Sequence, residues 1–292
     1  MNQIPATPPG ATTTITPRKS ATHRIGSFLL LAAVVWLLTI STAHAADDGF
    51  PGRPIYFHVP VMELDELKAA MDRDEVTVVD VRTRYEFDTL RIEGAEHVSF
   101  DDPAFVEKVR AIHSAAPDKK IVFYCRGHSC FLSYQAVERM KAAGFDRSIS
   151  MDAGIFDWAE NYPEQTALFG VSPIDTADLI DFNQFKARLL PPLEFSARVQ
   201  REGARALDIR RPFERDGISL FVGREENIGA EDTDRMIRFL EQVRDSGETL
   251  YVFDISGHEV KAFQYTLEAV GVENYYFMDG GAKALFSDFE RL

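Results

Sequence analysis

The sequence contains one long internal repeat, which restricts the chain to few architectures. Segment 79–86 (VDVRTRYE) is matched by 207–214 (LDIRRPFE), and 123–125 (FYC) is matched by 252–254 (VFD). A third pair, MDAG and MDGG, follows in the same order, and the offset stays between 127 and 129 residues. This period is far longer than a solenoid unit, so it predicts two globular domains built on one plan. A chain of 292 residues is long enough for both.

Each copy alternates apolar runs with segments of helical spacing. This alternation predicts an α/β fold in which a parallel β-sheet is covered by helices. In the first copy the expected strands are 76–81, 121–124 and 148–151, and the expected helices are 62–71, 103–115 and 131–143, before a short last turn at 155–158. In the second copy the expected strands are 206–209, 250–253 and 275–278, the expected helices are 231–245 and 259–270, and the stretch 190–203 is predicted to be a longer loop.

Cys125 has the position that best suits a nucleophile. It follows the expected strand 121–124 and opens the polar segment 125–130 (CRGHSC), ahead of an expected helix. A helix N-terminus carries partial positive charge and unpaired N–H groups. These favour a thiolate, which is the reactive form of cysteine, and the charge of Arg126 would add to the same field. The arrangement predicts nucleophilic sulfur chemistry at Cys125.

Taken together, these elements resemble the rhodanese (sulfurtransferase) family. The residues that carry the resemblance are 78–82 (VVDVR), Glu86-Phe87, Gly94-Ala95, Cys125, 142–145 (AAGF), and Gly154 with Trp158. The resemblance implies two rhodanese-like domains, at 55–162 and 176–292. Each is expected to be a parallel β-sheet covered by helices. The segment 163–175, which contains two prolines and a glycine, is predicted to be the linker.

The resemblance also implies a reaction. Members of this family take sulfur from a donor such as thiosulfate onto a strand-end cysteine, hold it as a persulfide and pass it to a thiophilic acceptor. Carried over to this chain, Cys125 is the nucleophile, and Arg126, Gly127, His128 and Ser129 are expected to bind the donor. Arg126 would attract an anion, and Gly127 would relieve the turn that points backbone N–H groups at the sulfur. No metal or organic cofactor is required.

The loop departs from the usual family pattern, Cys-x-x-Gly-x-Arg. Gly127 comes one place early, and Cys130 stands where the arginine is expected. Longer loops in this superfamily accommodate larger anions in phosphatase and arsenate-reductase relatives, so the donor stays open. Cys125 and Cys130 are the only cysteines, which excludes a small disulfide scaffold and makes Cys130 a candidate redox partner of Cys125.

The second copy lacks the nucleophile. Asp254 stands in the place of Cys125, and Glu259 replaces the usual loop arginine. A carboxylate cannot carry a persulfide and repels anionic donors, so the domain at 176–292 is predicted to be catalytically silent. In the first copy, Asp80, Arg82 and Glu86 are expected to form a structural ion-pair network.

The first 45 residues have the features of a secretory signal peptide. Arg18, Lys19 and Arg24 precede an apolar run at 28–40, and small residues at 43 and 45 favour cleavage before Ala46. The run is shorter than the roughly 20 residues that span a bilayer. We therefore expect 1–45 to be removed on export, most simply into a bacterial periplasm. An uncleaved membrane anchor is the alternative.

The net charge of the chain limits the classes of partner that it is expected to bind. The formal net charge is −14, and removal of 1–45 takes away three basic residues and no acidic ones, which gives −17. Such a surface disfavours nucleic acid and anionic membranes. The expected partners are a small anionic sulfur donor and a thiol or cyanide-like acceptor, with a periplasmic protein as a further candidate.

Three functions compete at this stage. The leading prediction is an exported sulfurtransferase that works through a Cys125 persulfide. The second is a thiol–disulfide redox or sensor protein that uses Cys125 and Cys130. The third is a non-enzymatic module that keeps the fold and binds a partner through its loops. Sulfur transfer needs a thiol that accepts sulfane sulfur, redox chemistry needs both cysteines, and a binding module needs neither.

Overall fold

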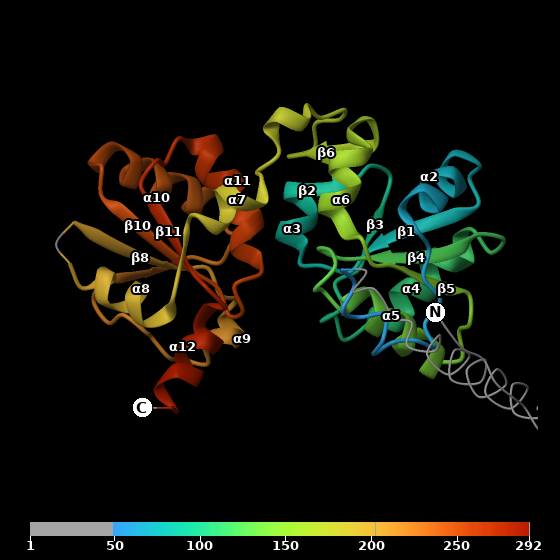
Figure 1. Ribbon diagram of the computed structural model, residues 1–292, viewed down its shortest axis with the longest axis horizontal. Helices are drawn as coiled ribbons and strands as arrows, with labels where there is room; N and C mark the ends of the chain where they lie inside the picture. Colours follow the sequence, from blue (N-terminus) through green and yellow to red (C-terminus); the bar gives the residue numbers. More distant parts are fainter. Residues whose placement is uncertain (1–48, 202, 292) are drawn as a thin grey trace, which may run out of the picture. The chain divides into compact units, whose positions relative to one another are not determined.

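Two parallel β-sheets organise the chain in the computed structural model, which describes residues 49–201 and 203–291 (Figure 1). The first sheet has the strand order β3 (Glu96–His97), β1 (Val76–Asp80), β4 (Lys120–Tyr124) and β5 (Ser148–Met151). The second has the order β7 (Leu189–Leu190), β11 (Tyr275–Met278), β10 (Thr249–Phe253), β8 (Ala204–Asp208) and β9 (Glu225–Asn227). The predicted signal peptide, 1–45, lies outside the described residues.

The two sheets share one topology. β1, β4 and β5 correspond in sequence to β8, β10 and β11, and in each set the three strands lie side by side in parallel register. Even the extra strand β7 has a counterpart, because Val61 forms a parallel bridge to Ser150 of β5. The predicted α/β class, with two parallel sheets covered by helices, is confirmed.

Helices cover both faces of the first sheet. They are α2 (Leu64–Asp72), α3 (Arg84–Thr89), α4 (Phe105–Ala115), α5 (Leu132–Ala142) and α6 (Gly154–Asn161). Alternate strand residues face opposite sides, as the period of a strand requires. Val78 and Val122 pack with α2 and α6, whereas Val79 and Phe123 pack with α4 and α5.

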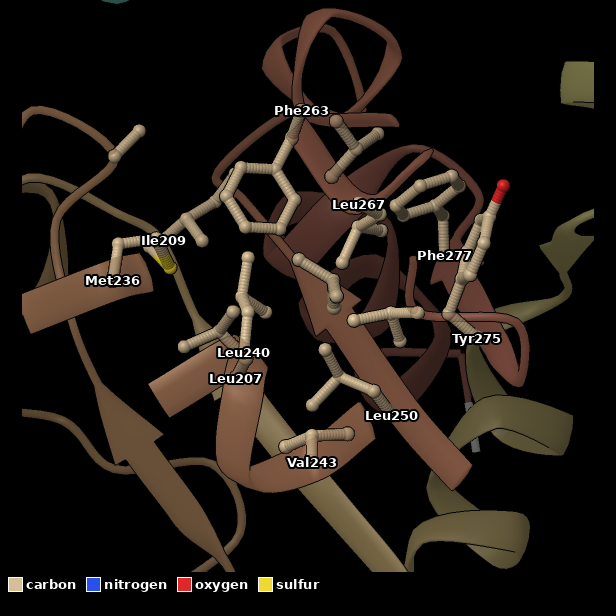
Figure 2. Packing of buried hydrophobic residues seen from close by; sticks show 14 of the residues in the cluster. Leu207, Ile209, Met236, Leu240, Val243, Leu250, Phe263, Leu267, Tyr275 and Phe277 are labelled. Atoms are coloured by element: carbon tan, nitrogen blue, oxygen red, sulfur yellow. The ribbon is translucent and has the colours of Figure 1, made fainter. Parts of the chain in front are cut away.

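The second sheet is covered in the same way, by α8 (Pro192–Val199) and α12 (Gly281–Phe289) on one face and α10 (Thr233–Ser246) and α11 (Glu259–Val270) on the other. Figure 2 shows the second of these faces, where Leu207 and Leu250 of the sheet meet Leu240 of α10 and Phe263 of α11. Short helices α7 (Phe182–Lys186) and α9 (Pro212–Arg215) complete this copy.

The prediction of a loop at 190–203 is wrong, because most of these residues belong to β7 and α8. Pro192 occupies the first turn of α8, where a missing N–H costs nothing. The helix buries Phe195 and Val199, four residues apart, against the sheet. This is the place that α2 holds in the first copy, so the repeat is more complete than the sequence pattern indicated.

The predicted linker has structure of its own. Within 163–175, a 3-10 turn η1 (Pro163–Gln165) leads into β6 (Thr166–Leu168), which pairs antiparallel with β2 (Leu90–Ile92). A second turn, η2 (Thr176–Asp178), follows. Residues 49–292 cluster as one compact unit, and α3 contacts α11 within it. At this contact the Thr83 hydroxyl donates a hydrogen bond to Glu259 at 2.8 Å.

Candidate active site

The candidate loop connects β4 to α5 and is held by short backbone contacts. Cys125 directly follows β4, and α5 begins at Leu132. The Cys130 N–H donates to the Gly127 carbonyl at 2.8 Å, and the Ile155 N–H donates to the Cys125 carbonyl at 3.0 Å. The strand-loop-helix setting predicted for Cys125 is confirmed.

Gly154 allows the loop to lie against the start of α6. Its φ is +76°, and a Cβ at this position would lie 2.3 Å from the backbone nitrogen of Gly127. Both the conformation and the space require glycine here. The MDAG motif of the sequence therefore has a physical role, which is to let two backbone segments meet under the cysteine loop.

Cys125 lies under the loop and is fully buried. Its thiol donates to the Cys130 carbonyl at 3.2 Å and lies 3.8 Å from the Ser133 hydroxyl oxygen. Burial, followed by the interaction with Cys130, raises the pKa of Cys125 well above its usual range. Burial of the charge therefore opposes the predicted Cys125 thiolate in this arrangement.

Cys130 has the opposite surroundings. It is partly exposed, and its sulfur lies 3.8 Å from a guanidinium nitrogen of Arg126. The neighbouring Cys125 thiol lowers the pKa of Cys130 to about 5, with help from the Arg126 charge and the backbone N–H groups of Arg126 and Leu132, while burial opposes the shift. The surroundings of Cys130 therefore favour a thiolate, whereas those of Cys125 favour the neutral thiol.

Arg126 is fixed by a carboxylate that the sequence did not connect to the loop. Its Nε and Nη2 bind the two oxygens of Glu86 at 2.5 and 2.6 Å. Glu86 also caps the first turn of α3 through Thr83. Burial disfavours the charge of Glu86, but Arg126 and Arg82 outweigh burial and lower its pKa. The sequence predicted Glu86 in an ion-pair network with Asp80 and Arg82, but no local pattern connected it to Arg126.

The other two members of the predicted ion-pair network, Asp80 and Arg82, form a buried pair with each other. Arg82 Nη2 lies 2.5 Å from Asp80 Oδ2, and both side chains are buried. Arg82 also donates to the carbonyl of Leu90 at 2.6 Å, which ties the end of β1 to β2. The second copy repeats the pair with Arg210 and Asp208 at 2.8 Å.

A pocket opens beside the loop, and only some of the predicted site residues line it. The lining includes Arg126, Ser129 and Cys130 from the first copy and Asp254, Ser256, His258, Glu259 and Lys283 from the second. Cys125, Gly127 and His128 are absent from that lining. His128 instead binds Asp157 at 2.8 Å and stacks on Phe50, with ring centroids 4.1 Å apart.

In the second copy, a carboxylate fills the corresponding loop. Asp254 is buried, and one of its oxygens accepts hydrogen bonds from the N–H groups of Ser256, at 2.9 Å, and of Gly257. The other accepts from Glu259 and Val260 at 2.6 and 3.3 Å. Four converging N–H groups form an anion nest. The chain itself supplies the anion at this loop.

Two features are absent from residues 49–201 and 203–291. No group of three or more His, Cys, Asp or Glu side chains is arranged to hold a metal ion. Within the same residues, no helix has the length and apolar character needed to cross a membrane.

Comparison with known proteins bears on the first copy. Residues 63–161 match the family model of the rhodanese-like domain. Among curated proteins, the tRNA uridine(34) hydroxylase of Escherichia coli O139:H28 is 30% identical over 109 residues. The match covers 36% of this chain and 29% of the relative, so it concerns one domain of a longer protein.

The chain also has similarity to solved structures. A thiosulfate sulfurtransferase from Pseudomonas aeruginosa is 18% identical, with a TM-score of 0.34, and the match covers 82% of this chain and 47% of that chain. A rhodanese-related protein from Thermoplasma volcanium is 21% identical, with a TM-score of 0.28, and the match covers 35% of this chain and 93% of that chain.

Proposed function

We propose that this protein is a sulfurtransferase whose loop 125–130 accepts sulfane sulfur from a small anionic donor such as thiosulfate. The sulfur is held as a persulfide, on Cys125 according to the sequence prediction, and passes to a thiol or to cyanide. One observation carries the proposal. A two-thiol loop follows a parallel strand, and one of its sulfurs lines a pocket beside Arg126 and inward-pointing N–H groups.

The pocket has the electrostatics that this reaction needs. Sulfur transfer requires a thiolate, and a thiolate requires positive charge or N–H donors around it. Arg126 supplies the charge beside the sulfur. The lining also holds three more cations, Arg82, Arg211 and Lys283, together with the carboxylates of Asp101, Glu214, Asp254 and Glu259. The loop 125–130 lies within the segment that matches the rhodanese-like domain. A net charge of −14 disfavours RNA, so the tRNA in the name of the curated relatives is not part of the proposal.

The mass of the intact protein tests the proposal. Incubation with thiosulfate should add the mass of one sulfur atom, and subsequent cyanide should remove it. The matched control is the double variant Cys125→Ser/Cys130→Ser, which has no thiol and should stay unmodified. Native protein that gains no sulfur at any donor concentration would refute the proposal.

A reversible disulfide is the second candidate, and one observation favours it. The Cys125 sulfur lies 3.2 Å from the carbonyl oxygen of Cys130, so the two cysteines are neighbours in the folded loop. Oxidation would join them and remove the Cys130 thiolate from the pocket. Alkylation of protein taken from its natural compartment without reductant tests this, because two free thiols there would exclude a resident disulfide.

Export to the periplasm belongs to the same proposal. The basic start, the short apolar run and the small residues before Ala46 support it. The N-terminus of protein isolated from its natural compartment should begin at or near Ala46. Full-length chain in the membrane fraction would support an anchor instead.

A further inference from the structure

The two loop thiols differ in every property that decides reactivity. Cys125 has no exposed surface, packs in the apolar cluster between the sheet and α5, and donates its proton to the Cys130 carbonyl. Cys130 is partly exposed, lines the pocket and lies beside the guanidinium of Arg126. A nucleophile must be both charged and accessible to its donor.

We propose that Cys130, and not Cys125, attacks the sulfur donor and carries the persulfide. This inference rests on the proposed sulfur transfer and assigns it to a different residue. The reversal follows from local geometry. The strand-end position places Cys125 beneath the loop, whereas Cys130 stands at the far end of the loop, where the pocket begins.

The step balances with thiosulfate as the donor. The Cys130 thiolate attacks the outer sulfur of thiosulfate, and a bond forms between that sulfur and Sγ. The sulfur–sulfur bond of thiosulfate breaks, and sulfite leaves with the electron pair. No proton moves, and the total charge of −3 is the same on both sides. The acceptor then attacks the outer sulfur of the persulfide, and Cys130 leaves as the thiolate that began the cycle.

Cys125 acts in this step as a positioning residue. Its thiol donates a hydrogen bond to the Cys130 carbonyl at 3.2 Å, which keeps the two residues adjacent, and its proximity lowers the pKa of Cys130. Arg126 makes the same contribution from the pocket side, and Glu86 holds its guanidinium in place. The Arg126 cation and the neutral Cys125 thiol therefore both stabilise a negative charge on Cys130.

Peptide mapping locates the persulfide directly, because Arg126 separates the two cysteines. Trypsin should release 121–126 with Cys125 and 127–139 with Cys130. Full-length native protein is loaded with thiosulfate for a series of times, alkylated with iodoacetamide and digested. We expect the additional sulfur first on 127–139. Sulfur that appears first or only on 121–126 overturns this inference but leaves sulfur transfer intact. Sulfur on neither peptide refutes the sulfur transfer itself.

Variants of Cys125 test its positioning role through a pH profile. The alkylation rate at Cys130 should follow its thiolate and stay high down to about pH 5 in native protein. Cys125→Ala removes the donor and should move this profile to higher pH. Cys125→Ser restores a hydroxyl donor and should move it less. Equal profiles in all three proteins would show that Cys125 does not support the charge on Cys130. Circular dichroism confirms that each variant is folded.

Discussion

Asp254→Ala should open the nest that the chain fills with its own carboxylate. The native side chain accepts four backbone N–H groups. A hydrogen bond to a charged group contributes about 1.5–3 kcal/mol, and water that enters the emptied loop recovers part of the loss. We expect the free energy of unfolding to fall by about 3 kcal/mol, which corresponds to a Tm lower by about 6–12 °C.

An added anion should reverse this loss. Sulfate or thiosulfate that occupies the open nest at 100 times its Kd would restore about 2.7 kcal/mol. The assay is thermal unfolding of native protein and of Asp254→Ala, with and without the anion. Asp279→Ala is the matched control, because Asp279 is an exposed residue near the same loop. It also measures the general stabilisation by such salts, which acts on any folded protein.

Two results would refute the reasoning. A loss below about 1 kcal/mol in Asp254→Ala would mean that the four contacts do not stabilise the fold. An anion that raises the Tm of Asp254→Ala no more than that of native protein would mean that the loop does not form an anion site. Asp254→Asn, by contrast, should leave sulfur-transfer turnover unchanged if the domain at 176–292 is catalytically silent.

Three further predictions concern the loop supports. Glu86→Gln breaks the buried pair with Arg126 and should lower the free energy of unfolding by about 3 kcal/mol in urea; a loss under about 1 kcal/mol would contradict it. Gly154→Ala should cost more than Gly94→Ala by about 1–3 kcal/mol, since both have left-handed φ but nothing lies within 4 Å of the added Cβ at Gly94; equal losses would exclude the clash. Burial and the Glu86 charge raise the pKa of Glu259 to about 8, so the folded state favours the protonated carboxyl. The free energy of unfolding should therefore fall as the pH rises from about 4.5 to 8, and Glu259→Gln should reduce this dependence on pH. The same dependence on pH in the variant and in native protein would argue against it.

The sequence predicted those features that depend on periodicity and repetition. The apolar runs located β1, β4 and β5, and the repeat then located β8, β10 and β11, because buried parallel strands are short apolar segments. Helix α8 was missed because two adjacent prolines resemble a loop signal. A proline in the first helical turn is compatible with a helix, so the signal was ambiguous.

The sequence could not predict the direction of each loop side chain. Cys125 and Cys130 looked alike as thiols near a helix N-terminus. Which one is buried depends on how the segment 125–130 folds over the end of β4. The contact between Glu86 and Arg126 joins residues 40 positions apart, and it arises only because α3 lies beside the loop. Such contacts are set by tertiary packing, and no local pattern encodes them.

Thiocyanate formation from thiosulfate and cyanide tests the central claim most directly. The account predicts steady turnover by the full-length native protein and none by the double variant Cys125→Ser/Cys130→Ser, which keeps the fold but lacks both thiols. A native protein that forms no thiocyanate above the uncatalysed rate, or a double variant that matches native turnover, would contradict the account.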